Sequence, residues 1–493
     1  METQDASIQA PKSLDIKVKT TTSRQAIAWL IGGALAALIV MLLPLGLERS
    51  AQVTLAIFVF TVALWIGEVL PTGISALVWT VLLVVFVGVK TLPEATIFSG
   101  FAKNTVWLLV GAFLIGEAMT KTHLAHRIAY RLMALGGSSY KRVVFFLWIA
   151  AMILGLIVPS GAVRMAIMIP IMLGIGQAFH VKLNSKFAVN ILLNVYWSSM
   201  VFEALWYTAT NLNLTAMGVL GTETGFQPSW IGWFVWMIIP VILMGLGLYF
   251  IINKIFAPEK EYLDAAGNVQ SIQQSLNDLG PVSTGERKAL IFFLITLALW
   301  VTEPYHKINS AYVALVMGAA LFLPGIGVLE TKDINKISWN TLLLMGIALG
   351  MGAVMKGVKL DTWLVAKLLD PILTPFARMG TIGVSFGTTL FCGLVHFLMP
   401  SGSAQTAALA PLLAKYAITA GLNPDVILLI VPRASSQMVI LPYESVPLMV
   451  LWGTGYLNTK GCLKTFGTIA GFLLVWLTFM GPFWAWITSI VRF

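Results

Sequence analysis

The sequence predicts an all-α membrane protein with about 11 transmembrane helices, two re-entrant hairpins and two halves of inverted topology. Three observations predict this fold class: the composition, the long apolar segments and an internal repeat. Of the 493 residues, 58% are hydrophobic and only 11% are charged. Soluble domains carry about 25% charged residues, so these few ionisable groups could not cover a water-soluble surface of this size.

The apolar segments are the right length for a lipid bilayer, which is therefore an expected partner. About 20 apolar residues in a helix cross the hydrocarbon core, and shorter segments suit tilted, broken or re-entrant helices. The segments are 26–45, 51–66, 74–89, 104–119, 143–158, 187–202, 230–252, 289–301, 311–324, 339–355, 426–441 and 467–491.

Other classes of function find little support in the composition. The net charge of +10 comes from basic residues in loops rather than from a nucleic-acid-binding face, so no nucleic-acid partner is expected. The cysteines, Cys392 and Cys462, form no disulfide framework. The five histidines have no metal-ligand spacing, and no nucleophile–base pair is visible. We therefore expect no enzyme, no metal and no cofactor.

An internal repeat relates two halves of the chain, roughly 64–220 and 299–455. The repeated residues keep a nearly constant separation, which chance rarely produces. The pairs are Leu64-Trp65 with Leu299-Trp300, Asn104-Thr105 with Asn340-Thr341, Pro159-Ser160-Gly161 with Pro400-Ser401-Gly402, Pro170 with Pro411, and Ser198-Ser199 with Ser435-Ser436.

Loop charge orients the two halves. With the N-terminus in the cytoplasm, most lysines and arginines fall in cytoplasmic loops, as the positive-inside rule requires, and the two repeats are inverted. No cleaved signal peptide is visible. The expected organisation is a cytoplasmic segment 1–25, a leading span 26–45, a first half 46–252, a cytoplasmic linker 253–288, an inverted second half 289–466 and a last span 467–493.

Two hairpin tips occupy matching positions in the halves. The tips read Val158-Pro-Ser-Gly-Ala-Val-Arg164 and Met399-Pro-Ser-Gly-Ser403. Proline and glycine interrupt both arms, which leaves backbone N–H groups free for an anion at a helix N-terminus. The candidate substrate-binding residues at the tips are Ser160, Gly161, Ala162, Ser401, Gly402 and Ser403. A serine tip can also merely cap the backbone, but two symmetric tips favour a binding site.

Two broken helices form a second matching pair, at Tyr207–Asn213 and Leu441–Pro447. So many hydroxyl and amide groups are costly in hydrocarbon unless they line a cavity or bind something. Hydrogen bonding between helices is the alternative role. The candidate binding residues here are Thr208, Thr210, Asn211 and Ser445.

Two cationic candidates flank the tips. Arg164 follows Ser160 by one turn, and an arginine inside a membrane segment is a functional candidate by default. The alternative is a structural salt bridge to Glu203. His396 precedes the second tip, and its alternative role is that of a hydrogen-bonded core residue.

The remaining intramembrane charges suggest weaker hypotheses. We expect Arg433 and Lys415 near the membrane interface, with their charged ends reaching water. Glu203 and Glu444 sit at the broken helices, where they neutralise arginines or carry a proton. Glu68 is expected to be structural, near the end of a span.

Paired serine tips, paired broken helices and inverted repeats together resemble the divalent anion:sodium symporter family, and the resemblance covers nearly the whole chain. The family carries di- and tricarboxylates. In its sodium-coupled members the tips read Ser-Asn-Thr, and both asparagines help to hold sodium. Here Gly161 and Gly402 replace them, and glycine supplies no side-chain oxygen.

The tips instead resemble those of the family's sodium-independent exchangers. Pro159-Ser-Gly-Ala-Val-Arg164 is similar to their Pro-Ser-x-x-x-Arg tip, and His396-Phe-Leu-Met-Pro-Ser401 to their His-Tyr-x-x-x-Ser tip. The resemblance implies that Arg164 and His396 offset the substrate's charge in place of sodium, since an uncompensated buried charge costs several kcal/mol.

The sequence and the resemblance together predict a carrier in the plasma membrane of a bacterium, and the resemblance implies that it is a homodimer. It is expected to exchange C4–C5 dicarboxylates such as malate, succinate, fumarate or 2-oxoglutarate by alternating access. The alternatives are a sodium-coupled dicarboxylate symporter and a proton or ion antiporter of related architecture.

Overall fold

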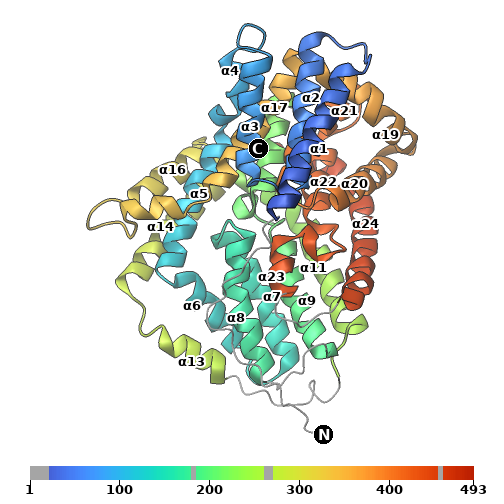
Figure 1. Ribbon diagram of the computed structural model, residues 1–493. Coiled ribbons are helices and arrows are strands. Elements are labelled where there is room, and N and C mark those ends of the chain that lie inside the picture. The colour runs from blue at the N-terminus through green and yellow to red at the C-terminus, as the bar shows by residue number, and fades with distance from the viewer. Residues whose placement is uncertain (1–21, 179–184, 260–269, 453–458) are drawn as a thin grey trace.

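A computed structural model describes residues 22–178, 185–259, 270–452 and 459–493, and this part of the chain holds helices and turns but no strand (Figure 1). Most of the predicted segment 1–25, residues 179–184, residues 260–269 of the predicted linker and residues 453–458 lie outside it. In chain order the elements are α1 (Ser23–Leu42), α2 (Arg49–Ile66), α3 (Thr72–Phe86), α4 (Glu94–Ile97), η1 (Ser99–Ala102), α5 (Asn104–Lys121), α6 (Leu124–Ala134), α7 (Tyr140–Ile157), α8 (Gly161–Ala178), α9 (Lys186–Phe202), η2 (Tyr207–Ala209), α10 (Asn211–Thr224), α11 (Trp230–Ile255), α13 (Gln270–Asp278), α14 (Thr284–Val301), α15 (Glu303–His306), α16 (Ser310–Ala320), η3 (Thr331–Lys336), α17 (Trp339–Gly357), α18 (Leu360–Leu364), η4 (Val365–Leu369), α19 (Asp370–Ala377), α20 (Gly380–Leu398), α21 (Gly402–Thr419), α22 (Pro424–Gln437), η5 (Pro442–Glu444), α23 (Val446–Trp452) and α24 (Thr459–Ile490).

Seven of the described helices are long and apolar enough to cross a membrane, namely α1, α2, α7, α11, α17, α20 and α24. Shorter apolar stretches lie in α3, α8 and α16. The all-α membrane fold class is therefore confirmed. The count of about 11 spans and the inverted relation of the halves stay predictions.

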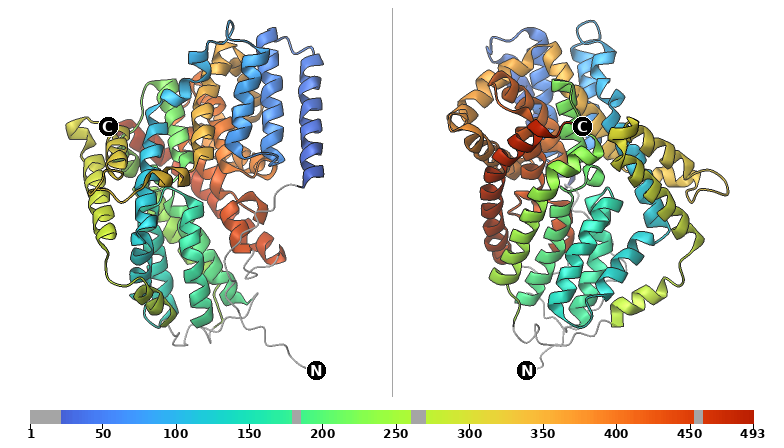
Figure 2. Two further views of the ribbon diagram at one scale, coloured as in Figure 1. Left: turned by 60° about the vertical axis from the view of Figure 1, so that its left-hand side comes forward. Right: turned by 180° about the vertical axis from the view of Figure 1, so that it is seen from behind.

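The leading helix α1 stands at the edge of the molecule (Figure 2). It starts with a capping box, in which Thr22 and Gln25 exchange side-chain and backbone hydrogen bonds. Of its 20 residues only Gly33 is buried, where the chain packs closely on Ala63 and Phe60 of α2. The apolar remainder of α1 faces outward, as a lipid-contacting helix does.

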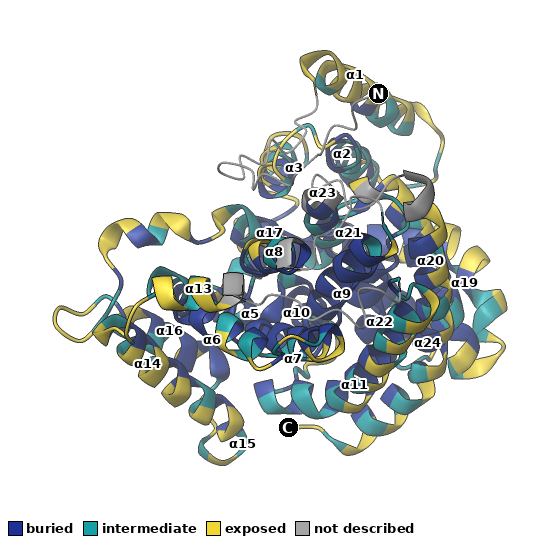
Figure 3. Cartoon of the chain, turned by 90° about the horizontal axis from the view of Figure 1, so that it is seen from below, coloured by how far each residue is buried: buried dark blue, intermediate teal, exposed yellow. Residues whose placement is uncertain are grey.

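The centre of the molecule is formed by α9, α10, α21 and α22, which are buried on most sides (Figure 3). Two asparagines in the interior of α9 are hydrogen-bonded. Asn190 accepts from Tyr140, and Asn194 accepts from the indole N–H of Trp148, at 2.6 and 2.9 Å. Satisfied polar groups of this kind fix how helices pack inside a membrane protein.

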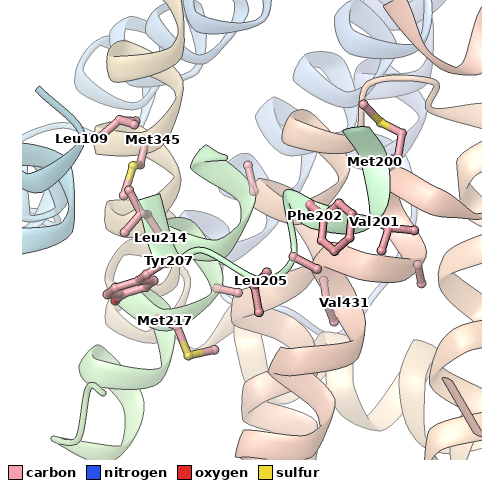
Figure 4. Packing of buried hydrophobic residues seen from close by; sticks show 14 of the residues in the cluster. Leu109, Met200, Val201, Phe202, Leu205, Tyr207, Leu214, Met217, Met345 and Val431 are labelled. Atoms are coloured by element: carbon pink, nitrogen blue, oxygen red, sulfur yellow. The ribbon is translucent and has the colours of Figure 1, made fainter. Parts of the chain in front are cut away.

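The chain between α9 and α10 leaves the helical path inside this core. Leu205 and Tyr207 of the connection pack among buried apolar side chains, including Met200, Phe202 and Met217 (Figure 4). Trp233 stacks on Tyr207 with a ring separation of 5.3 Å. This packing holds irregular backbone in place where a membrane protein otherwise requires helix.

An ion-pair network joins the end of α5 to η3, across the two halves. Lys121 contacts Asp333 at 2.6 Å, and Lys336 contacts Asp333 and Glu117 at 2.9 Å each. Burial raises the pKa of Asp333, but hydrogen bonds from Lys121, from the Glu330 backbone N–H and from Lys336 outweigh this effect. They hold the pKa of that carboxyl well below its usual range.

Helix α6 anchors the end of the predicted linker. Arg127 on α6 pairs with Glu286 at 2.8 Å and donates to the carbonyl oxygens of Leu279 and Gly280. Glu286 also completes a capping box with Ser283 at the start of α14. The buried pair therefore fixes where the second half begins.

Candidate functional site

A cavity of about 660 Å³ opens where the hairpins and the broken helices meet. This volume is within the range of about 300–1,000 Å³ typical of small-molecule sites. Its lining comes from the α2–α3 turn, both tips and both breaks, and comprises Trp65, Glu68, Val69, Leu70, Pro71, Thr72, Gly161, Ala162, Met200, Glu203, Thr210, Asn211, Leu212, Asn340, Pro400, Ser401, Gly402, Ser403, Ser435, Ser436, Tyr443, Glu444, Ser445, Pro447 and Met449.

Each hairpin tip delivers the start of a helix to this cavity. Helix α8 begins at Gly161, after an interruption at Val158–Ser160, and α21 begins at Gly402. The hydroxyl oxygen of Ser160 accepts from the Val163 N–H at 3.5 Å, and that of Ser401 from the Ala404 N–H at 3.3 Å. Both serines are thus N-caps, and the first turns of both helices face the cavity.

The first broken helix resumes at the cavity too. Thr210 caps α10, its hydroxyl accepting from the Leu212 N–H at 3.4 Å. The neighbouring Asn211 exchanges two hydrogen bonds with Ser403, at 3.1 and 3.2 Å, and so joins the first break to the second tip. In the second half, α23 begins beside Ser445.

Eight of the residues predicted from the sequence line the cavity: Gly161, Ala162, Thr210, Asn211, Ser401, Gly402, Ser403 and Ser445. Four others do not. Ser160, Arg164, Thr208 and His396 stand behind the lining, and of these only Ser160 is partly exposed.

Arg164 is fully buried, and all three of its guanidinium nitrogens make hydrogen bonds. Its guanidinium pairs with Glu203 at 3.2 Å and donates to the carbonyl oxygens of Val158 and Ala209 at 2.9 and 2.8 Å. It also donates to the Ser199 hydroxyl at 3.3 Å. The suggested salt bridge to Glu203 is therefore present, and Arg164 ties the first tip to the first break.

His396 is buried within the second hairpin. Its Nδ1 lies 2.9 Å from the amide oxygen of Gln405, whose nitrogen donates to the Cys392 carbonyl oxygen at 2.6 Å. This arrangement bridges α20 and α21, the two arms of the hairpin. Thr208 lies beside Trp230, whose indole N–H donates to its hydroxyl at 3.4 Å.

One expectation about the charged residues is wrong. The charged end of Arg433 does not reach water, since its side chain is completely buried in α22. The sequence could not reveal this, because burial of Arg433 depends on α10, α20 and α21 packing around α22. Lys415 is partly exposed and pairs with Asp361 at 3.4 Å.

Several residues that line the cavity were not among the candidates predicted from the sequence. Ser435 and Ser436 end α22 at the cavity, and their match to Ser198-Ser199 in the repeat was the available signal. Asn340 donates to the Thr72 hydroxyl at 3.2 Å, and its oxygen accepts from the Gly73 N–H at 2.8 Å. This contact holds the α2–α3 turn against α17.

Three carboxylates face the same cavity. Glu203 is paired with Arg164, and Glu444 accepts from the Ile440 N–H at 2.6 Å. Glu68 follows α2 with a left-handed φ of 46°. Its side chain is exposed, so water can solvate the carboxylate. Glu68, for which we expected a structural role, also lines the cavity. Among the described residues, no group of three or more His, Cys, Asp or Glu could hold a metal ion.

The comparison with known families covers the whole helical region. The family model for the sodium:sulfate symporter transmembrane region matches residues 25–490. The chain belongs to this family. The family assignment made from the hairpin tips, to the divalent anion:sodium symporters, is thereby confirmed.

Similar proteins of the family are transporters. The L-tartrate/succinate antiporter of Escherichia coli (strain UTI89 / UPEC) is 25% identical over 478 residues, or 92% of this chain and 96% of that one. The chloroplastic dicarboxylate transporter 1 of Spinacia oleracea is 24% identical over 464 residues, or 90% of this chain and 78% of that one. The protein is accordingly a membrane transporter and not an enzyme.

A solved transporter structure shares the fold. The YdaH transporter of Alcanivorax borkumensis matches 82% of this chain and 90% of its own, with a TM-score of 0.59 and 15% identity. At this identity the likeness concerns the arrangement of helices alone.

Proposed function

We propose that this family member exchanges C4–C5 dicarboxylates, such as malate, succinate, fumarate and 2-oxoglutarate, across the membrane by alternating access and without sodium. One observation carries the proposal: α8, α10 and α21 all begin at the same cavity. Each helix N-terminus presents free N–H groups and about half a positive charge. Three such ends attract an anion with two separated carboxylates.

The proposed substrate contacts are the lining residues of both tips and both breaks: Gly161, Ala162, Thr210, Asn211, Ser401, Gly402, Ser403 and Ser445. Their hydroxyl, amide and backbone N–H groups donate to carboxylate oxygens. Ser160, Arg164, Thr208 and His396 hold these groups in place from behind. Backbone donors at a helix start are suited to binding carboxylates because they need no further reorganisation.

Independence from sodium rests on the tip sequences. Gly161 and Gly402 stand where sodium-coupled members carry asparagine, and a sodium ion needs several oxygen ligands. The L-tartrate/succinate antiporter among the relatives supports exchange as the mode and succinate as a substrate. We further propose inverted repeats, a cytoplasmic N-terminus, a homodimer and the plasma membrane of a bacterium as the setting.

Uptake by proteoliposomes tests the proposal. Liposomes loaded with unlabelled succinate should take up labelled succinate equally well in sodium and in potassium, and empty liposomes should take up little. Strong sodium-driven uptake into empty liposomes would instead identify a symporter.

A second arm uses labelled sulfate, because the family description names sodium and sulfate. Exchange of sulfate in preference to succinate would overturn the proposed substrate class. A third arm imposes a pH gradient without any dicarboxylate, because Glu203 and Glu444 at the cavity are the groups that a proton antiporter would use. Proton flux under those conditions would identify that alternative.

A further inference from the structure

The buried arginine of α22 has few partners. The side chain of Arg433 has no exposed surface, and one guanidinium nitrogen, Nη2, donates to the side-chain oxygen of Asn213 on α10. Its Nε and Nη1 atoms have no hydrogen-bond partner among the described residues. Unpaired donors on a buried charge are costly, so a residue of this kind requires an explanation.

Arg164 makes the contrast clear. It is buried to the same degree, yet all three of its guanidinium nitrogens have partners and Glu203 lies in ion-pair contact. Arg433 has no carboxylate within 4.0 Å in the described parts of the chain, although Glu203 attracts it from farther away. Glu203 is therefore in ion-pair contact with Arg164 alone, and Arg433 has no ion-pair partner of its own among the described residues.

Arg433 lies on the part of α22 that leads into the cavity lining. Ser435 and Ser436, two and three residues farther along α22, line the cavity. Three residues in a helix rise about 4.5 Å. The partner Asn213 belongs to the first turn of α10, whose residues Asn211 and Leu212 line the same cavity. The hydroxyl of Ser435 also has no partner in the described structure.

We propose that Arg433 is the cation that offsets the negative charge of the bound substrate and makes the carrier prefer dianions to monoanions. This inference rests on the proposed function. The field of this charge is weakly screened, because the side chain of Arg433 has no exposed surface. Arg433 has no carboxylate in ion-pair contact among the described residues, and a bound dicarboxylate would place negative charge near it.

Two substitutions remove this charge by different routes. Arg433→Gln deletes the cation, whereas Asn213→Asp keeps it and places a carboxylate of nearly the same shape against it. Arg433→Lys retains the charge and serves as the control. Apparent affinities for succinate and for monomethyl succinate are measured at pH 8, by ligand-dependent thermal shift of the purified full chain and by competition in proteoliposome exchange.

We expect Arg433→Gln and Asn213→Asp each to weaken succinate binding at least tenfold, equivalent to about 1.4 kcal/mol. Binding of the monoanion should change much less, and Arg433→Lys should keep the preference for succinate. A purely structural arginine predicts a different result: the folded Arg433→Gln and Asn213→Asp variants should then keep the preference for succinate over the monoanion. That result would overturn the inference.

The proposed function can fail separately. If the unaltered protein neither binds nor exchanges dicarboxylates, the function itself is wrong. If it exchanges succinate and the folded variants keep its preference for dianions, only the role of Arg433 is wrong. Should Arg433→Gln fail to fold, Asn213→Asp decides the matter, because it preserves the arginine and its packing.

Discussion

The two tip glycines occupy equivalent positions but have different surroundings, which gives a matched pair of substitutions. A methyl group built on Gly402 would overlap the Ser435 carbonyl oxygen and approach its carbon to 3.1 Å. A methyl group on Gly161 would meet nothing closer than 3.7 Å, the distance to the Arg164 guanidinium. Neither glycine has a left-handed φ, so alanine fits the backbone conformation at both.

Alanine at Gly402 should therefore push the second tip away from α22. Relief of the overlap needs a shift of about 1 Å, and overpacking of this kind costs about 1–3 kcal/mol. A displacement of about 1 Å at a binding site can lower a rate by about 100-fold. We expect Gly402→Ala to slow succinate exchange by about tenfold to 100-fold and to lower the melting temperature.

Gly161→Ala is the control. It should melt at or slightly above the temperature of the unaltered protein, because alanine restricts the unfolded chain and stabilises by about 0.4–1 kcal/mol where it fits. The assays are exchange in loaded proteoliposomes and thermal unfolding in detergent. Normal exchange by Gly402→Ala, or an equal loss of melting temperature in both variants, would refute the reasoning.

Three further predictions concern buried and bridging groups. Arg164→Ala should destabilise the protein by about 3–5 kcal/mol by leaving Glu203 buried without its cation, and adding Glu203→Gln should recover part of the loss in a thermal-unfolding double-mutant cycle. Ser403→Ala should weaken the apparent affinity for succinate by up to about tenfold, because a hydrogen bond such as those between Ser403 and Asn211 is worth about 0.5–1.5 kcal/mol. An unchanged affinity would exclude the proposed role of Ser403. Asp333→Asn should lower the melting temperature by the same amount at pH 8 and at pH 5. The pKa of Asp333 is depressed in the folded protein, so its stabilising effect is lost only as the pH falls toward that folded-state pKa. A smaller effect of the substitution at pH 5 than at pH 8 would contradict the role of the ion-pair network.

The fold class and the position of the tips follow from local sequence. A bilayer demands apolar helices with internally satisfied backbones, so composition and segment length suffice to predict an all-α membrane protein. The Pro-Ser-Gly motifs predict interruptions, and the structure has helices beginning at Gly161 and Gly402. Proline, serine caps and glycine act within one turn, which is why sequence can place them.

The surroundings of the charged residues could not be predicted in this way. Arg164 and Arg433 both follow apolar residues in membrane segments, yet one is saturated with partners and the other is not. The difference arises from Glu203, Ser199 and Asn213, which packing brings near from other parts of the chain. Glu68 reaches the cavity through a left-handed turn that its neighbours in sequence do not specify.

Counterflow of labelled fumarate tests the central claim most directly, since this substrate is fully dianionic at neutral pH and exchange needs no imposed ion gradient. In liposomes preloaded with unlabelled fumarate and free of sodium, the label should accumulate transiently above its external concentration, and adding sodium should change neither the rate nor the extent. Absence of counterflow in potassium, together with sodium-dependent uptake into empty liposomes, would contradict sodium-independent exchange.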